Sequence, residues 1–213
     1  MIEVEHVCLS FGKRKILEDV NLTVYDGETM VILGASGSGK STLLKLIIGL
    51  LKPDSGSIKV NGKEISSLTE REMNEERRRM GMVFQYSALF DSMNVKENVA
   101  FGLRQHTDLS EEEIENMKKR VSLARAIALN PQIILYDEPT AGLDPIRATD
   151  ISLLIKQMQK EMKVTSIVVT HDLKSAEMVD DRMAFLYEGS FLAVGTAEAL
   201  ASSRDYRVKQ FMN

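Results

Sequence analysis

The sequence predicts an α/β fold with a mainly parallel sheet flanked by helices on both faces, and three observations lead to this prediction. Short apolar strands alternate with helical segments along the chain. A glycine-rich loop joins the apolar run 29–33 to a helical run that begins at residue 40. Two further apolar strands, 133–137 and 164–169, lead into acidic or imidazole side chains, which is typical of strands whose carboxyl ends line a site.

The first part of the chain is predicted to hold antiparallel strands and the first strand of the parallel sheet. Residues 2–9 and 19–25 are expected strands on either side of a turn at Phe11-Gly12-Lys13. Residues 29–33 form a continuous apolar run, which is typical of a buried strand. We therefore expect a β-subdomain beside the main sheet.

The next segment is predicted to hold two helices separated by a hairpin. Residues 40–51 form an apolar helical stretch, and a turn follows at 52–56. Residues 58–60 with Asn61-Gly62 indicate a short hairpin, because Asn-Gly favours a type I′ turn. Residues 69–79 carry Glu, Arg and Asn without an apolar stripe. That composition predicts an exposed helix whose terminal arginines are balanced by glutamates and face solvent.

The second half of the chain continues the alternation of helix and strand. Residues 117–129 are a predicted helix, and 133–137 are a buried strand of isoleucine, leucine and tyrosine that ends in aspartate. A helix at 146–162, a β-branched strand at 164–169 and a helix at 173–179 follow. The last two predicted strands, joined through a glycine-containing turn, are 183–187 and 191–194.

Composition and charge describe an ordinary globular chain. It has 213 residues, 44% hydrophobic and 27% charged, with a formal net charge of −4. A net negative charge of this size does not indicate nucleic-acid binding. Its apolar runs are too short to span a bilayer, and residues 1–5 do not have the pattern of a signal segment. The single cysteine, Cys8, fits a reducing cytoplasm and is expected to be a buried small hydrophobe.

The glycine-rich loop has the form G-x-x-x-x-G-K-[ST] and lies between a strand and a helix, which is the setting that this motif needs. Its residues are Gly34, Ala35, Ser36, Gly37, Ser38, Gly39, Lys40 and Ser41. Glycines allow successive N–H groups to turn towards phosphate oxygens, and the helix N-terminus adds a favourable dipole. Lys40 is expected to reach the β- and γ-phosphates, and the Ser41 hydroxyl to bind Mg²⁺. The loop therefore predicts binding of a nucleoside triphosphate.

Two strand ends supply further candidate groups. Asp137 and Glu138 follow one apolar strand, and His171 follows another. Because carboxyl ends of parallel strands share an edge, all three are expected beside the phosphates. Asp137 is a candidate for holding Mg²⁺ through a water molecule, and Glu138 is a candidate general base. A ring nitrogen of His171 would then hydrogen-bond the γ-phosphate and the attacking water.

With these motifs in order, the sequence resembles the nucleotide-binding domain of ABC transporters over its whole length. Phe11 matches the aromatic residue that stacks on adenine, and the loop with Thr42 matches Walker A. Gln85 matches the glutamine that touches Mg²⁺ and faces the membrane subunit. Asp144 lies in a segment that looks like the D-loop, which communicates across a dimer. The resemblance implies ATP and Mg²⁺ as cofactors, with catalytic roles for Lys40, Gln85, Glu138 and His171.

Loop sequences narrow the resemblance to the Mla/Mce-type lipid transporters. The segments that carry it are 84–95, 103–107 and 207–211. In that family a homodimer of ATPases drives integral membrane permease subunits that move phospholipid or a related lipid. Family partners are a periplasmic MCE-type lipid-binding ring and, in some members, an STAS-domain protein. The resemblance implies a cytoplasmic, peripheral position on the inner face of the cell membrane, with no nucleic-acid partner.

One family motif is missing from the sequence. ABC ATPases carry a signature loop, typically Leu-Ser-Gly-Gly followed by Gln or Met, and the chain has none. Residues 117–126 resemble the stretch directly after those glycines, whereas 109–116 resemble the start of an earlier helix. We expect residues 1–213 to form one domain, with about 86–116 as a remnant of the helical subdomain. Either the protein carries a further segment between Asn116 and Met117, which we favour, or the gene product truly lacks it.

Three other interpretations compete with lipid transport. The chain could serve an ABC transporter for another substrate. A non-transport ABC ATPase that acts on nucleic acid or ribosomes usually has long coiled-coil insertions or tandem cassettes, and the sequence shows neither. An ATP-binding module with little hydrolysis fits only if the signature is truly absent. Co-purification with an integral membrane protein and steady ATP turnover separate these interpretations.

Overall fold

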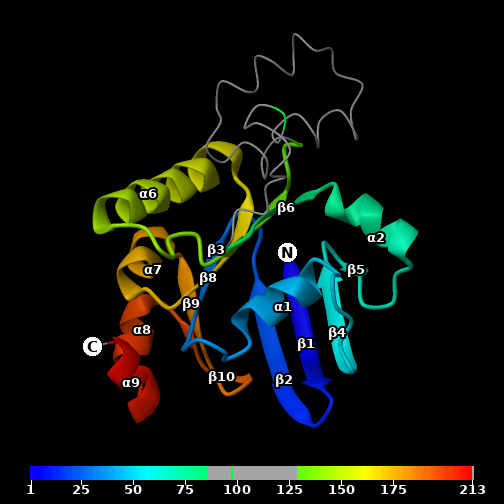
Figure 1. Cartoon of the computed structure of the whole chain (residues 1–213), viewed down its shortest axis with the longest axis horizontal. Helices are drawn as coiled ribbons and strands as arrows, with labels where there is room; N and C mark the ends of the chain where they lie inside the picture. Colours follow the sequence, from blue (N-terminus) through cyan, green and yellow to red (C-terminus); the bar gives the residue numbers. More distant parts are fainter. Residues whose placement is uncertain (86–96, 98–128, 213) are drawn as a thin grey trace.

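The computed structural model describes residues 1–85, Glu97 and residues 129–212 (Figure 1). The break in family pattern between Asn116 and Met117, and all but the last residue of the predicted helix 117–129, lie outside these residues. No helix within the described ranges is long and apolar enough to cross a membrane.

A six-stranded sheet forms the centre of the molecule and confirms the predicted parallel core. Its strand order is β10-β9-β3-β8-β7-β6, with β9 to β6 parallel and β10 antiparallel at one edge. The strands are β3 (Thr29–Leu33), β6 (Met80–Val83), β7 (Ile133–Asp137), β8 (Thr165–Thr170), β9 (Arg182–Tyr187) and β10 (Ser190–Gly195). Every residue of β3, β7 and β8 is buried. Continuous apolar runs therefore identified these strands correctly.

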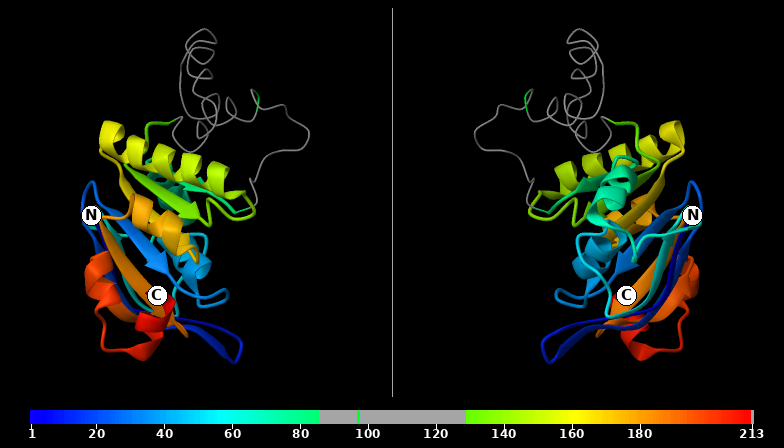
Figure 2. Two further views of the ribbon diagram at one scale, coloured as in Figure 1. Left: turned by 90° about the vertical axis from the view of Figure 1, so that its left-hand side faces the viewer. Right: turned by 90° about the vertical axis from the view of Figure 1, so that its right-hand side faces the viewer.

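A second, four-stranded antiparallel sheet has the order β2-β1-β4-β5. Its strands are β1 (Ile2–Phe11), β2 (Arg14–Val24), β4 (Ser55–Val60) and β5 (Lys63–Glu64). The β1–β2 hairpin is longer than predicted, because bulges interrupt the pairing of β1 and break the apolar–polar alternation that marks a strand. Asn61 and Gly62 have φ angles of 51° and 77°, as the predicted turn between β4 and β5 requires. Figure 2 shows the β1–β2 hairpin extending beyond the body of the protein.

Helices and the second sheet cover the two faces of the central sheet. One face packs against α1 (Lys40–Ile47) and the four-stranded sheet, with Met30 and Ile32 of β3 in the shared core. The other face packs against α6 (Pro145–Met162), α7 (Leu173–Val179), α8 (Ala197–Ala201) and α9 (Tyr206–Met212). The sequence analysis did not predict α8 and α9, which have only five and seven residues.

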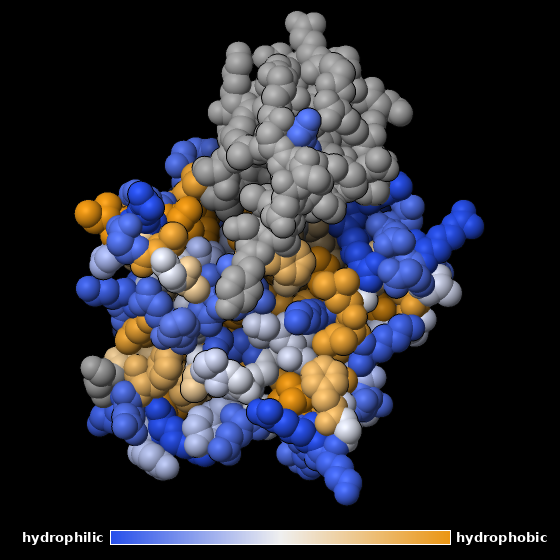
Figure 3. All heavy atoms as spheres, viewed as in Figure 1, coloured by the Kyte–Doolittle hydropathy of each residue, from blue (hydrophilic) through white to orange (hydrophobic). Residues whose placement is uncertain are grey.

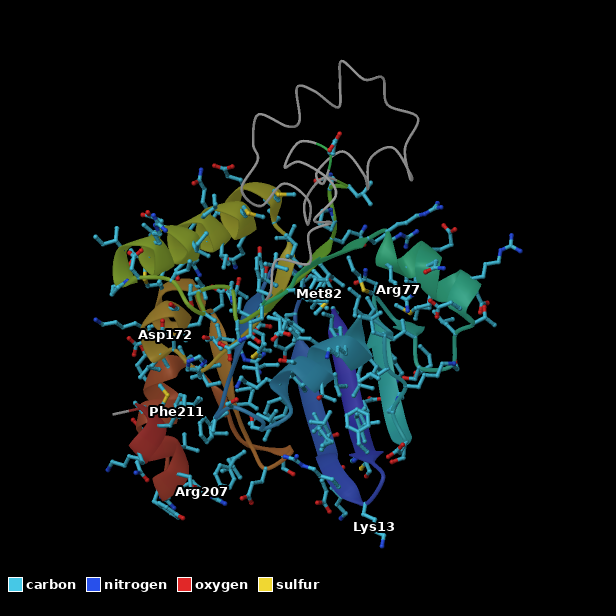
Figure 4. The ribbon with its side chains drawn as sticks, viewed as in Figure 1. Lys13, Arg77, Met82, Asp172, Arg207 and Phe211 are labelled. Carbon is cyan, nitrogen blue, oxygen red and sulfur yellow. The ribbon has the colours of Figure 1, made fainter. Side chains whose placement is uncertain are left out.

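The helix α2 (Glu70–Arg77) begins with a capping box between Thr69 and Glu72. Hydrophilic side chains gather over it, as predicted (Figure 3). Arg77 is an exception to the predicted solvent-facing arginines: it points towards α1 (Figure 4) and donates to the carbonyl oxygens of Ile48 at 3.0 Å and Gly49 at 2.7 Å. Arg77 thus satisfies carbonyls where α1 ends, earlier than predicted, at a glycine with φ of 70°.

Candidate active site

The segments that follow three strands meet at the carboxyl edge of the parallel sheet, where the strands end. Leu33 pairs with Thr170, and Asp137 pairs with Val169, so β3, β7 and β8 end at nearly the same level. The next residues in the chain are Gly34, Glu138 and His171. The structure therefore brings together the loop, the acidic pair and the histidine, as their positions after strands predicted.

The loop that follows β3 needs its glycines for close packing. A Cβ on Gly34 would lie 2.3 Å from the carbonyl oxygen of Leu186. Gly39 has a φ of 109°, and a Cβ there would lie 2.8 Å from a methyl group of Leu17 and 3.0 Å from the carbonyl oxygen of Ile16. Backbone and side chains already occupy these positions, so a larger residue would displace the loop. The same contacts place the loop against the start of β2.

Lys40 is the buried cation of the site. Its side chain is 5% exposed, and Nζ donates to the carbonyl oxygens of Gly34 at 2.8 Å and Ala35 at 3.0 Å. Nζ also lies 3.6 Å from Oε1 of Glu138. Burial lowers the pKa of Lys40, and the negative charge of Glu138 opposes that shift. Lys40 therefore carries its charge inside the loop next to a carboxylate.

Ser41 and Asp137 place two oxygen atoms that could bind a metal next to each other, at the start of α1 and the end of β7. The Ser41 hydroxyl donates to Oδ1 of Asp137 at 2.7 Å, and Asp137 is buried. A hydroxyl and a carboxylate are ligands that Mg²⁺ takes when substrate phosphates and water complete its shell. The residues thus fit the predicted metal. In the described part of the chain, no cluster of three or more His, Cys, Asp or Glu side chains is arranged to hold a metal without such help.

The loop also contains an unsatisfied polar group. The Ser38 hydroxyl is buried and has no hydrogen-bond partner in the described structure. Buried hydroxyls usually find a partner, because leaving one unpaired costs about 1–3 kcal/mol. A phosphate oxygen in the loop would supply an acceptor. The loop's chemistry therefore fits a phosphate-bearing ligand.

Glu138 and His171 form a hydrogen-bonded pair at the same edge. His171 Nδ1 lies 2.9 Å from Oε2 of Glu138, and the His171 backbone N–H also faces this oxygen at 3.4 Å. The carboxylate is 10% exposed, whereas the imidazole is 60% exposed. Glu138 has a φ of 49°, in the left-handed region that non-glycine residues rarely adopt. Its N–H donates to the carbonyl oxygen of Val169 at 2.9 Å, which holds this turn in place.

The remaining predicted site residues lie around this centre. Phe11 ends β1, is 53% exposed and pairs with Arg14. Thr42 follows Ser41 within α1 and is half-buried. Gln85 is exposed two residues after Val83, whose partner in the sheet is Tyr136. The nucleotide contacts of these residues stay predictions.

Asp144 has a structural role that was not predicted from the sequence. Its carboxylate accepts from the N–H groups of Ile146 and Arg147, both at 3.1 Å, and so caps α6. Its ion pair, at 3.4 Å, is with the Arg147 side chain. The position before Pro145 at the helix start was a signal for this cap. Within the described residues, the bonds of Asp144 are to α6 and not to the loop.

Comparisons with known proteins agree with this geometry. The sequence pattern of the family described as ABC transporter matches residues 17–141. The "Intermembrane phospholipid transport system ATP-binding protein MlaF" of Haemophilus influenzae is 40% identical, covering 100% of this chain and 90% of that protein. The "Probable ribonucleotide transport ATP-binding protein mkl" of Mycobacterium tuberculosis is 41% identical over 100% of this chain, which spans 66% of that relative.

Both alignments run over 237 positions, against 213 residues in this chain. The relatives therefore contain residues that have no counterpart here. Among solved structures, a bacterial ABC transporter cassette in dimeric form matches with a TM-score of 0.84 and 31% identity, over 92% of this chain and 98% of that one. A dimeric post-hydrolysis state bound to ADP and Pi matches with a TM-score of 0.84 and 30% identity, over the same shares of the two chains.

Proposed function

The chain belongs to the ABC transporter family, and from that premise we propose that it binds MgATP at the carboxyl edge of its central sheet and hydrolyses it. One observation carries the proposal: a buried lysine, a hydroxyl–carboxylate pair and a carboxylate–imidazole pair occupy the same sheet edge. These are the three kinds of group that transfer of a phosphoryl group to water requires.

The loop and its neighbours would hold the phosphates and the metal. Lys40 and the backbone N–H groups of residues 34–41 would bind the phosphates, while Ser41 and Asp137 would hold Mg²⁺. Mg²⁺ held there would neutralise negative charge on the phosphate oxygens. Phe11 would stack on adenine, and Gln85 would sense the metal from the end of β6.

Glu138 would act as general base for the attacking water. Its carboxylate is nearly buried and is anchored on one side by His171. With Nδ1 donating to Glu138, Nε2 of His171 is left as an acceptor for a neighbouring donor, and the tautomer is fixed by this bond. His171 would therefore orient the base, and its Nε2 would accept a hydrogen bond from the attacking water; only the protonated ring, with N–H on both nitrogens, could also donate to the terminal phosphate.

The substitution Glu138→Gln tests the hydrolysis proposal. An amide of the same length cannot accept the proton, so we expect turnover to fall about 1,000-fold while MgATP stays bound. Phosphate release and equilibrium nucleotide binding should be measured on the same preparation. Turnover that persists in this variant removes Glu138 from the role of base.

The cellular role that we infer is to power a phospholipid transporter at the inner face of the cell membrane. The relatives named MlaF support this substrate, since the chain spans 88–90% of their length. In this proposal a homodimer works with integral membrane permease subunits, with an STAS-domain protein and an MCE-type lipid-binding protein as further partners. Co-purification with an integral membrane protein, followed by phospholipid exchange between vesicles in the presence of ATP, tests it.

Another transported substrate is the alternative, because the mycobacterial relative's name refers to ribonucleotides. The two are separated by giving the purified complex labelled phospholipid or labelled ribonucleotide and measuring which one moves with ATP. Movement of ribonucleotide alone contradicts the lipid proposal, while the proposed ATPase site stands.

We also propose that the native protein carries a signature segment between Asn116 and Met117. The longer alignments of the relatives support this, since 237 positions exceed the 213 residues of the chain. Intact-mass measurement decides the question. A mass well above 23.9 kDa agrees with the extra segment, and a mass of 23.9 kDa contradicts it and favours an ATP-binding module with little hydrolysis.

A further inference from the structure

We propose that Glu138 has a second role at the binding step, in which its carboxylate competes with nucleotide phosphate for Lys40. The inference rests on the proposed function, because it concerns the same loop. It adds that a nucleotide phosphate that binds the Lys40 ammonium group also frees Glu138, the proposed base, from its ion pair with Lys40.

The contacts of Lys40 leave few donors for a phosphate. An ammonium group has three N–H donors. In the structure two of them serve the carbonyl oxygens of Gly34 and Ala35, at 2.8 and 3.0 Å. Oε1 of Glu138 lies 3.6 Å from Nζ as an ion-pair partner, and a side chain that is 5% exposed has little access to water. A phosphate that binds the third donor therefore competes with this carboxylate for the charge of Lys40.

Glu138 is the charged partner of Lys40 and also the one that can move away. It is an anion, whereas the other two partners are neutral backbone carbonyls fixed in the loop. A buried carboxylate that loses its cation needs another partner, because an unpaired buried charge is strongly unfavourable. His171 supplies one, since Nδ1 already lies 2.9 Å from the second carboxylate oxygen. When Lys40 turns to a phosphate, Glu138 stays bonded to His171.

The consequence is that Glu138 is paired with a cation until a phosphate takes that cation away. Phosphate binding then leaves Glu138 bonded to His171 alone at the moment when a water has to be activated. The same displacement reduces the affinity of the loop for nucleotide, and this reduction is measurable without any turnover.

Two substitutions at one position separate direct competition from simple charge repulsion. Glu138→Gln keeps the length of the side chain and removes its charge. Glu138→Asp keeps the charge and withdraws the carboxylate by one methylene, about 1.5 Å further from Lys40. The affinity of the full chain for MgADP should be measured by titration calorimetry, because MgADP cannot be hydrolysed at the terminal bond and still offers a β-phosphate to Lys40.

We expect both variants to bind MgADP about three- to tenfold more tightly than the wild type, since each frees Lys40. Glu177→Gln, which removes an exposed negative charge from α7, is the matched control and should leave the affinity unchanged. Thermal unfolding midpoints of all variants check that each is folded. In addition, the ¹⁵N resonance of Lys40 Nζ should shift in both Glu138 variants and not in the control.

Three results would overturn the inference. Unchanged MgADP affinity in both Glu138 variants shows that the carboxylate does not hold Lys40. Tighter binding in Glu138→Gln alone shows long-range repulsion rather than competition. A wild-type chain that does not bind MgADP at all contradicts the proposed function itself, and with it this inference, and so is distinguishable from the other two results.

Discussion

The two edges of the central sheet carry similar charges in different settings. At the amino edge, Glu28 is buried, accepts from the Tyr25 N–H at 2.7 Å and pairs with Arg182 at 3.0 Å. Asp181 accepts from the Thr29 N–H at 2.8 Å and from Lys156 at 3.0 Å. These charges bond to the backbone and tie neighbouring elements together.

At the carboxyl edge, charges of opposite sign lie beside one another at the glycine-rich loop. Lys40 lies against Glu138, Ser41 donates to Asp137, and Glu138 lies in a left-handed turn. The Ser38 hydroxyl has no partner among the described residues, but neither has the Thr29 hydroxyl at the amino end of β3. Neither burial of charge nor an unpaired hydroxyl alone therefore identifies a site. Charges bonded to the backbone stabilise the fold, whereas a cation, carboxylates and an imidazole gathered at a glycine-rich loop are available to a ligand.

The largest expected effect is at the carboxyl edge, with Lys40→Ala. Removing the buried ammonium removes the positive charge from the loop, so we expect MgATP affinity or turnover to fall about 100-fold or more. Calorimetric titration and a phosphate-release assay measure this. Urea unfolding should be measured alongside, because the loss of Lys40 leaves the nearly buried Glu138 carboxylate without its cation. Wild-type affinity in this variant contradicts the assignment of the edge.

At the amino edge, Glu28→Gln is expected to lower stability and to leave nucleotide binding unchanged. The Arg182 side chain would lose its buried anionic partner, so we expect the free energy of unfolding to fall by about 2 kcal/mol. Urea unfolding measures this, and MgATP affinity should stay within about twofold of the wild type. Glu177→Gln, an exposed carboxylate on α7, is the control and should change stability by less than about 0.5 kcal/mol. A loss of ATP affinity without a loss of stability in Glu28→Gln would reverse the comparison.

A smaller loss of nucleotide affinity is expected for Phe11→Ala. This variant tests whether the site extends from the carboxyl edge to the end of β1. Phe11 is 53% exposed at the end of β1, so its removal opens no cavity in the core. Loss of stacking on adenine should weaken nucleotide binding about tenfold. Phe11→Tyr keeps a ring and should bind as the wild type does. Equal affinity for the alanine variant places the adenine elsewhere.

The smallest effect is the acid response of the amino edge. Burial tends to raise the pKa of Asp181, but hydrogen bonds from the Thr29 N–H, Lys156 and Gln159 lower it below its ordinary value of 3.8. A carboxylate with a depressed pKa in the folded state stabilises the protein above its unfolded pKa, and this contribution is lost as pH falls through the folded pKa. Between about pH 5 and pH 2, wild-type stability should therefore fall more steeply than that of Asp181→Asn. Parallel pH profiles in urea unfolding would contradict this.

Much of the site was predictable because it depends on local patterns. Continuous apolar runs identified β3, β7 and β8, and the rule that parallel strands end at one edge brought Asp137, Glu138 and His171 together. Asn61-Gly62 fixed a turn through its own backbone preferences. In each case the information lies within a few residues of the structure it determines.

The rest depends on contacts between residues distant in sequence. The ion pair of Lys40 with Glu138 joins segments almost a hundred positions apart, and no local pattern reports it. The sequence predicted that Arg77, one of three consecutive arginines, faces solvent, yet its side chain donates to carbonyls at the end of α1. The amino-edge network around Asp181 was missed for the same reason. Tertiary packing decides which of several similar charges is buried.

The central claim is that the carboxyl edge of the sheet, where the loop lies beside Asp137, Glu138 and His171, is where ATP binds and is split. A crystal structure of Glu138→Gln grown with MgATP tests it most directly. We predict that the phosphates lie in the loop at residues 34–41, with Lys40 turned to them and Mg²⁺ on Ser41 and Asp137. Nucleotide bound at any other place, or a Lys40 side chain that does not contact the bound phosphates, would contradict the account.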